Sequence, residues 1–472
     1  MKSKSGIIVN FGANFFISIM FRMKWFVCLC FMASVVFRVS AQEVWTLDQC
    51  IRYAYDNNIR LKQQLLQVSA DENNLLQSKI GLLPTVNASG GFSSYKGKVL
   101  DQNTFTIVSG ETVHSMSAGA SGNLTLFKGF QQKNTIGQNL YTLLASIENV
   151  EKLKNDLSIN IALYYLQIIH AQEQLTVAEN QLTLTLMQVE RTAILVDAGS
   201  KPEGDLFEIQ SQAAREELQI VTARNNLDMS RLNLAQLLDL EARINFQVAV
   251  PDFSDIGISN DLVHSVDDLF ATAETILPEV KAAEYSLKSS EKQLSVVKGY
   301  RSPTLSLQGG YDTRYSSTAK MVDPITHEQL SYPVWDQLKD GVSKYVGVRL
   351  SIPIFNGWQV QTGVKNARLN MQSYQYQLQL TKNTLYKEIQ QAHAEAAAAL
   401  KQYLAAGKAV ASIEEAFRYT EQRYEVGLMN FVDYSTAKTR LTSAQSDLLQ
   451  AKFEYIFKTK VLDFYNGRPI TL

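Results

Sequence analysis

Hydrophobic positions along the chain follow two different spacings, and these spacings alternate twice between the N-terminus and the C-terminus. In two long segments the apolar residues step by alternating intervals of four and three, which is the pattern of a coiled-coil seam. The first segment, 131–197, has about 67 residues and predicts a helix roughly 100 Å long. The first stripe consists of Leu157, Ile161, Tyr164, Ile168, Ala171, Leu175, Ala178 and Leu182, and the second of Leu385, Ile389, Ala392, Ala396, Ala399, Tyr403, Ala406 and Val410.

Four shorter segments alternate apolar with polar or small residues at a period of two, which is typical of strands. They lie at 86–92, 118–126, 305–311 and 345–352. Each is close to the roughly 9–11 residues that a tilted strand needs to cross a bilayer. The pattern therefore predicts four membrane-spanning strands in each chain.

Loops at 95–115 and 312–344, rich in Gly, Ser and Asp, join these strands into two hairpins. Four strands cannot close a barrel, and unpaired strand edges are not tolerated in lipid. We therefore expect other copies of the chain to complete the barrel, and three copies would supply twelve strands.

The two halves of the chain also repeat one another. The motif Leu-Phe-Lys-Gly-Phe-Gln at 126–131 recurs 228 positions later as Ile-Phe-Asn-Gly-Trp-Gln, and Val-Asp-Ala-Gly at 196–199 recurs at the same offset as Tyr-Glu-Val-Gly. Such spacing indicates an internal tandem structural repeat. It predicts strand-to-helix turns at Phe127, Gly129, Phe355 and Gly357, and helix-tip turns at Gly199 and Gly427.

The first 41 residues have the composition of a secretory signal peptide. Basic residues precede an apolar run from Phe26 to Val36, and small residues at 39–41 form a cleavage site. Translation from Met20 or Met23 would give a leader of more ordinary length. The predicted organisation is a signal peptide at 1–41, repeat 1 at 42–240, an equatorial linker at 241–264, repeat 2 at 265–465 and a C-terminal tail at 466–472.

Composition narrows the class of function. Removing the leader takes away five basic and no acidic residues, so the net charge changes from −1 to −6 and does not favour nucleic-acid binding. Only Cys50 remains after the leader, which excludes an internal disulfide. The five histidines show no metal-ligand spacing, and no catalytic or cofactor motif is present, so we expect neither an enzyme nor a cofactor.

Taken together in their order and spacing, these motifs resemble those of the TolC family of outer-membrane efflux proteins. The matching points are Trp45-Thr46-Leu47, the strand-to-helix turns and the tip turns, over essentially the whole chain after the leader. The resemblance implies a mainly α fold with β, as a homotrimer: a 12-stranded β-barrel in outer-membrane lipid, continuous with a long α-helical coiled-coil barrel in the periplasm of a Gram-negative-type bacterium. It also implies a periplasmic adaptor protein and an inner-membrane pump of the RND or ABC type as partners.

The resemblance further implies that the periplasmic helix tips form the aperture. Tyr424 and Asp433 match the tip tyrosine and one acidic ring position of the family, and Asp205 matches the acidic position of the first repeat. A ring of aspartates around a pore attracts cations. From the sequence alone, core packing for Tyr424, and capping or helix-dipole roles for the two aspartates, remain open alternatives.

The tip also departs from the family pattern. Met429 stands where the family has an arginine, and Thr436 stands where it has a second acidic residue. A different latch is therefore expected, with Arg423 or Lys438 as candidates.

The sequence thus predicts a passive outer-membrane exit duct of a tripartite efflux system for small toxic compounds such as drugs or metals. Two alternatives stay open: a duct for type I protein secretion, and a non-transporting coiled-coil spacer or adhesin of the envelope.

Overall fold

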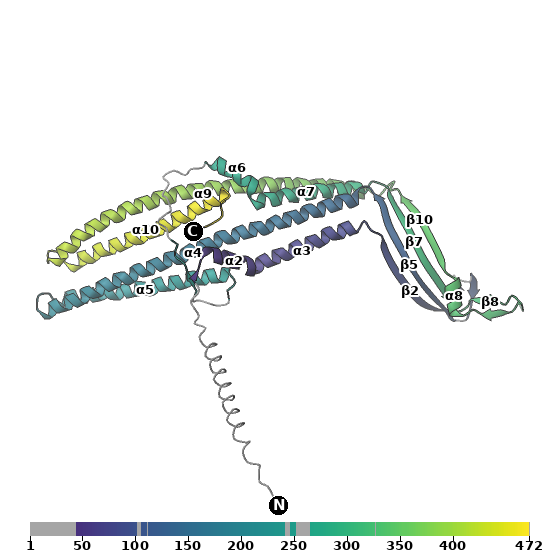
Figure 1. Cartoon of the computed structure of the whole chain (residues 1–472), viewed down its shortest axis with the longest axis horizontal. Coiled ribbons are helices and arrows are strands. Elements are labelled where there is room, and N and C mark those ends of the chain that lie inside the picture. The colour runs from purple at the N-terminus through teal and green to yellow at the C-terminus, as the bar shows by residue number, and fades with distance from the viewer. Residues whose placement is uncertain are drawn as a thin grey trace, which may run out of the picture.

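The computed structural model describes residues 44–101, 105–110, 112–240, 246–251, 265–325 and 327–471. The predicted signal peptide at 1–41 and most of the predicted linker at 241–264 lie outside the described residues. The described part forms one elongated body, with long helices over most of its length and a sheet at one end (Figure 1).

Two long helices run the length of the helical part. Helix α4 (Gln131–Asp197) and helix α9 (Gln359–Glu425) have 67 residues each, as the coiled-coil stripes predict. Each turns back at its tip into a helix of 35 residues, α5 (Glu203–Leu237) after α4 and α10 (Phe431–Tyr465) after α9. The result is two long helical hairpins that lie side by side (Figure 1).

The helices that open each half are divided in two. Helix α2 (Leu47–Asn57) is followed by α3 (Ile59–Ile80), and α6 (Val266–Ile276) is followed by α7 (Pro278–Gly299). The first break falls at Asn58, whose side chain caps α3 by accepting a hydrogen bond from Leu61 N at 3.1 Å. The second falls before Pro278, because a residue that precedes proline disfavours the helical conformation.

Both opening helices begin with a side-chain cap. Thr46 caps α2 in a capping box with Gln49, so that each side chain bonds the backbone N–H of the other residue. Ser265 caps α6 by accepting a hydrogen bond from Asp268 N at 3.2 Å. Each cap satisfies a backbone donor that the first turn of a helix leaves unpaired.

The sheet at the end of the molecule has four antiparallel strands in the order β10-β7-β5-β2. These strands are β2 (Thr85–Lys96), β5 (Thr112–Lys128), β7 (Thr304–Ser316) and β10 (Ser343–Ser351). The order leaves β2 and β10 as its two edges (Figure 1).

The loops predicted at 95–115 and 312–344 contain regular structure that the sequence pattern did not indicate. The first loop holds a short hairpin of β3 (Val99–Asp101) and β4 (Thr106–Val108). The second holds the hairpin of β8 (Lys320–Val322) and β9 (Gln329–Ser331), followed by helix α8 (Val334–Asp340). Segments of three strand residues are too short to give a clear period-two signal.

The main hydrophobic core lies near the middle of the helical part. There β1 (Val44–Trp45) pairs in parallel with β6 (Gln247–Val248). The buried Tyr165 of α4 secures this pair, since its hydroxyl donates to the carbonyl oxygens of Ala249 at 2.6 Å and Trp45 at 3.1 Å. Cys50 is fully buried in the same core, and burial raises the pKa of its thiol to about 12.

Candidate functional site: the helix tips and the two-faced sheet

The two helix tips close with the same backbone motif. At the first tip Gly199 has φ +70°, Gly199 N donates to Val196 O and Ser200 N donates to Leu195 O. At the second tip Gly427 has φ +77°, and the equivalent bonds run to Tyr424 O and from Leu428 N to Arg423 O. These are Schellman motifs, and their left-handed position favours glycine.

Tyr424 lies inside an aromatic cluster close to the tip. Its ring stacks on that of Tyr434, with centroids 4.5 Å apart and an interplanar angle of 18°, and it also contacts Phe431. Ile209 of α5 completes the buried set, so the cluster joins the two hairpins. Tyr424 is only 7% exposed in the single chain, which makes packing one of its roles.

Lys201, which sequence reasoning missed, connects the predicted tip residues. Its ammonium lies 4.5 Å from the centroid of the Tyr424 ring and 3.2 Å from the Tyr424 hydroxyl oxygen. The same ammonium pairs with Asp205 at 3.8 Å. Lys201 and Asp205 are four residues apart at the start of α5, and this spacing is the one sequence feature that could have indicated their ion pair.

The two aspartates occupy equivalent positions. Asp205 and Asp433 each stand in the first turn of a returning helix, but neither is the N-cap, which is Pro202 in α5 and Asn430 in α10. A carboxylate in the first helical turn is stabilised by the helix dipole. The backbone N–H of Asp433 donates to Asn430 Oδ1 at 2.8 Å, and its own side chain is exposed.

Of the two predicted latch residues, Lys438 is buried between helices. Its ammonium donates to Thr185 Oγ1 of α4 at 2.7 Å and lies 3.9 Å from Glu216 Oε1 of α5. Burial lowers the pKa of Lys438, and the Glu216 carboxylate opposes that shift. Lys438 thus ties α10 to the first hairpin, whereas the tips themselves are bridged by Arg191 and Glu425, 3.5 Å apart.

The four predicted strand-to-helix turn residues lie where the sheet meets the long helices. Gly129 and Gly357 have φ of +55° and +57°, and the residues that follow them, Phe130 and Trp358, are also left-handed. Several large side chains around these turns are exposed in the single chain: Phe127, Phe130, Ile354, Phe355 and Trp358. Aromatic residues in such a position are typical of a membrane–water interface.

The sheet has one apolar and one polar face. In the register of the strands, Val348 of β10 pairs with Leu307 of β7, which pairs with Leu124 of β5, so these three side chains share a face. The residues between them in sequence are mainly Ser, Thr, Asn, Gln and Gly. Large apolar residues on a solvent-exposed sheet face indicate a surface that lies in lipid.

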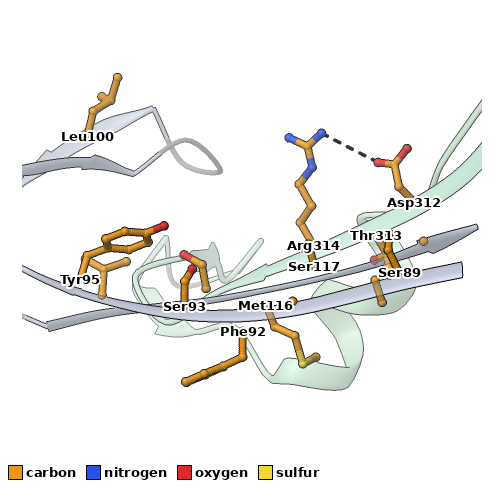
Figure 2. Close-up of a pocket in the computed structure, with 15 residues that line it drawn as sticks. Ser89, Phe92, Ser93, Tyr95, Leu100, Met116, Ser117, Asp312, Thr313 and Arg314 are labelled. Carbon is orange, nitrogen blue, oxygen red and sulfur yellow. Dashed lines mark ion pairs between the residues drawn. The ribbon is translucent and has the colours of Figure 1, made fainter.

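Figure 2 shows the two faces at the outer end of the sheet. Arg314 and Asp312 extend to one side, with a guanidinium–carboxylate distance of 3.9 Å, whereas Phe92 and Met116 extend to the other. The polar side is hollowed by a cavity of about 720 Å³, which Tyr95 also lines. This face is suited to water and ions.

Chemical sites of other kinds are not found in the part of the chain that the structure describes. Over those residues no group of three or more His, Cys, Asp or Glu side chains is placed to hold a metal ion. A search of the same residues finds no helix with the length and apolarity that a membrane crossing requires.

An exposed two-faced sheet joined to helices about 100 Å long defines a class: strand-anchored envelope proteins with a long helical extension. Comparison with known proteins specifies the family. Residues 50–239 and 272–459 match the model of the family described as Outer membrane efflux protein. These segments cover most of the chain, which therefore belongs to this family. It is an efflux channel protein, and it is located in the outer membrane.

Individual relatives are similar over nearly the same length. The chain is 24% identical to outer membrane protein TolC of Escherichia coli over 425 residues, covering 88% of this chain and 81% of that protein. It is 19% identical to outer membrane efflux protein BepC of Brucella suis over 424 residues, covering 90% and 85%. Among solved structures, VceC of Vibrio cholerae matches with a TM-score of 0.71 at 15% identity, covering 90% of this chain and 97% of that one.

Proposed function

We propose that three copies of the chain form a passive duct that exports small toxic compounds. In this assembly twelve strands close a β-barrel in the outer membrane, and the helical hairpins of the two repeats line up as a continuous tube in the periplasm. The predicted domain organisation, with two tandem repeats joined by a linker, supplies equal numbers of hairpins around the tube.

The observation that carries this proposal is the sheet with its two open edges. Strands β2 and β10 each pair on one side only within the described chain. The apolar face indicates lipid, where unpaired backbone groups cost several kcal/mol each. Pairing β10 of one copy with β2 of the next satisfies both edges, and repeating this pairing closes a ring.

A duct of this kind requires partners, because it contains no energy source. We propose a periplasmic adaptor protein that docks on the helical tube and an inner-membrane pump of the RND or ABC type that supplies cargo. Protein secretion stays a second candidate, since the chain is 22% identical to the alkaline protease secretion protein AprF of Pseudomonas aeruginosa over 331 residues.

The assembly can be tested by fractionation and mass. We expect the full-length protein to enter the outer-membrane fraction and, after detergent extraction, to have the protein mass of three chains by light scattering. In planar bilayers the same preparation should produce discrete conductance steps. A soluble periplasmic monomer after detergent-free lysis would exclude the duct and favour an envelope spacer.

The proposed aperture consists of Tyr424, Asp433 and Asp205 near the tip turns. We expect the double variant Asp205→Asn and Asp433→Asn to lose about tenfold in sensitivity to block by multivalent cations, because two rings of charge are removed. Single-channel recordings measure this block. Unchanged block and unchanged conductance would mean that the two carboxylates act only within the protein, on the helix dipole and, for Asp205, on Lys201.

A further inference from the structure

The polar face of the sheet carries two cations, Lys128 and Arg349, near the end where the strands join the helices. Lys128 of β5 lies opposite Thr304 of β7, and Arg349 of β10 lies opposite Ser306 of β7. Thr304 and Ser306 are two positions apart on one strand, so both cations share the polar face. Within the described part of the chain, neither cation makes an ion pair or a side-chain hydrogen bond.

Among the residues of the polar face that the structure describes, no carboxylate is placed to neutralise these cations. The nearest along β7 is Asp312, six residues from Ser306, which corresponds to roughly 20 Å of strand. Asp312 already pairs with Arg314, so that pair contributes no net charge. Strand β2, which would lie beside Arg349 of the neighbouring copy, contains no acidic residue.

The surrounding sequence increases this imbalance. Four segments run from the helix ends through the strand–helix junction into the sheet: 73–100, 112–147, 292–311 and 341–368. Together they contain 12 lysines and arginines and no aspartate or glutamate. The whole chain, by contrast, has 45 basic and 46 acidic residues. Positive charge is therefore concentrated around the sheet and its junction with the helices.

We propose that Lys128 and Arg349 form an anion-attracting ring inside the barrel of the duct, where it joins the helical tube, selective for multivalent anions over cations. This inference rests on the proposed trimer, in which the polar face lines the lumen and six cations surround it. Apolar walls on the outside of the barrel focus the field of these charges into the water-filled lumen. At low salt the Debye length is about 10–30 Å, so the field of the ring extends into the lumen.

Ion selectivity and anion block test the proposal in planar bilayers with the full-length protein. We expect wild-type channels to be blocked by inorganic tripolyphosphate, at lower concentration from the strand side than from the tip side. Arg349→Gln removes three charges from the ring. For a trivalent anion roughly 10 Å away, with one Debye length of screening, the half-blocking concentration should rise about tenfold. The double variant with Lys128→Gln should raise it further.

A matched control lies on the same strand. Lys344 pairs with Tyr311 and thus faces the opposite side of the sheet from Arg349. Lys344→Gln removes the same charge from each chain and should leave the block and the reversal potential unchanged. Arg349→Lys keeps the charge and should keep the block, whereas Arg349→Glu should shift the reversal potential in a salt gradient towards cation selectivity.

The possible failures are distinguishable. If the wild type and all variants conduct equally and show equal block, the anion ring is wrong while the duct stands. Equal effects of Lys344→Gln and Arg349→Gln would also overturn the ring, because only distant surface charge would then matter. If no variant produces a channel and the wild type is monomeric, the proposed duct itself is wrong. The acidic residues at the tips are shared by all variants, so they do not affect the comparison.

Discussion

At the residue scale, two glycines at equivalent sequence positions meet different surroundings. A Cβ added to Gly129 would lie 2.4 Å from Ser302 Cβ and 2.6 Å from Gly299 O, whereas a Cβ on Gly357 would meet no atom within 4 Å. Both glycines have positive φ. Sequence spacing identified the two turns as equivalent but could not show that the residues at and after the end of α7 crowd Gly129 and leave Gly357 open.

This difference predicts unequal effects of the same substitution. Gly357→Ala should destabilise the protein by about 1 kcal/mol, the cost of a left-handed alanine. Gly129→Ala adds a collision with Ser302 and Gly299 and should reach about 3 kcal/mol. Thermal unfolding in detergent measures both variants, and equal losses would contradict the close approach of α7.

A second residue-scale prediction concerns pH. His170 of α4 lies against Phe453 of α10, with ring centroids 5.9 Å apart, and burial lowers the pKa of its imidazole below the ordinary value of 6.5. As the pH falls, His170 therefore becomes protonated in the unfolded chain before it does so in the folded chain. The free energy of unfolding consequently decreases as the pH falls from 6.5 through the pKa of the folded state.

His170→Gln should flatten this part of the stability–pH curve, measured as the denaturation midpoint between pH 7 and pH 5. His327→Gln, in an exposed outer loop, serves as the control and should leave the curve unchanged. A wild-type curve that is already flat over this range would show that burial of His170 has no effect on stability.

At the element scale, the tips combine predictable and unpredictable features. Helix boundaries, tip turns and apolar stripes follow from local pattern, because 3.6-residue periodicity and left-handed glycines are encoded within a few positions. The contact of Lys201 with Tyr424 joins residues 223 positions apart and depends on how the two hairpins pack. Sequence pattern alone does not specify such a contact.

The cluster that joins the two hairpins gives an element-scale prediction. Tyr424→Ala removes a buried ring from between α9 and α10 and should lower stability by about 3 kcal/mol. Tyr419→Ala, on the same helix but 56% exposed, should change stability by less than about 0.5 kcal/mol.

Recording conductance on the same variants separates packing from constriction. Loss of stability at unchanged conductance would leave Tyr424 with packing alone. An increase in conductance would show that its ring also narrows the aperture.

At the scale of the whole molecule, the sequence predicted the helical hairpins, the four long strands and the family. The hairpins and strands follow from local patterns that occur twice along the chain, and the family follows from the order and spacing of the motifs. It did not predict the break at Asn58, the outer helix α8 or the polar contacts of Lys438. The cap at Asn58 is local, since its partner Leu61 N is three residues away, but it interrupts a continuous helical pattern. The seven-residue helix α8 and the buried Lys438 depend on neighbours that are distant in sequence.

Matched helix lengths give a prediction at this scale. Inserting seven residues into α4 alone preserves the spacing of its stripe but displaces one tip by about 10 Å relative to the other, and should abolish export. The same insertion in α4, α5, α9 and α10 keeps all tips level. Electron microscopy should then show particles longer by about 10 Å. Export should return only if the adaptor can still connect the longer tube to the pump.

Because α4 and α9 are equal in length, and α5 and α10 are too, the two hairpins place their tips at the same distance from the sheet. Helices of 67 residues in both hairpins hold every tip of the proposed tube at one depth below the membrane. A change in that depth that keeps the tips level requires equal insertions or deletions in all four helices, in multiples of the seven-residue repeat. In the proposed duct, the depth that the tips reach below the outer membrane is thus set, in steps of seven residues, by the length of these helices.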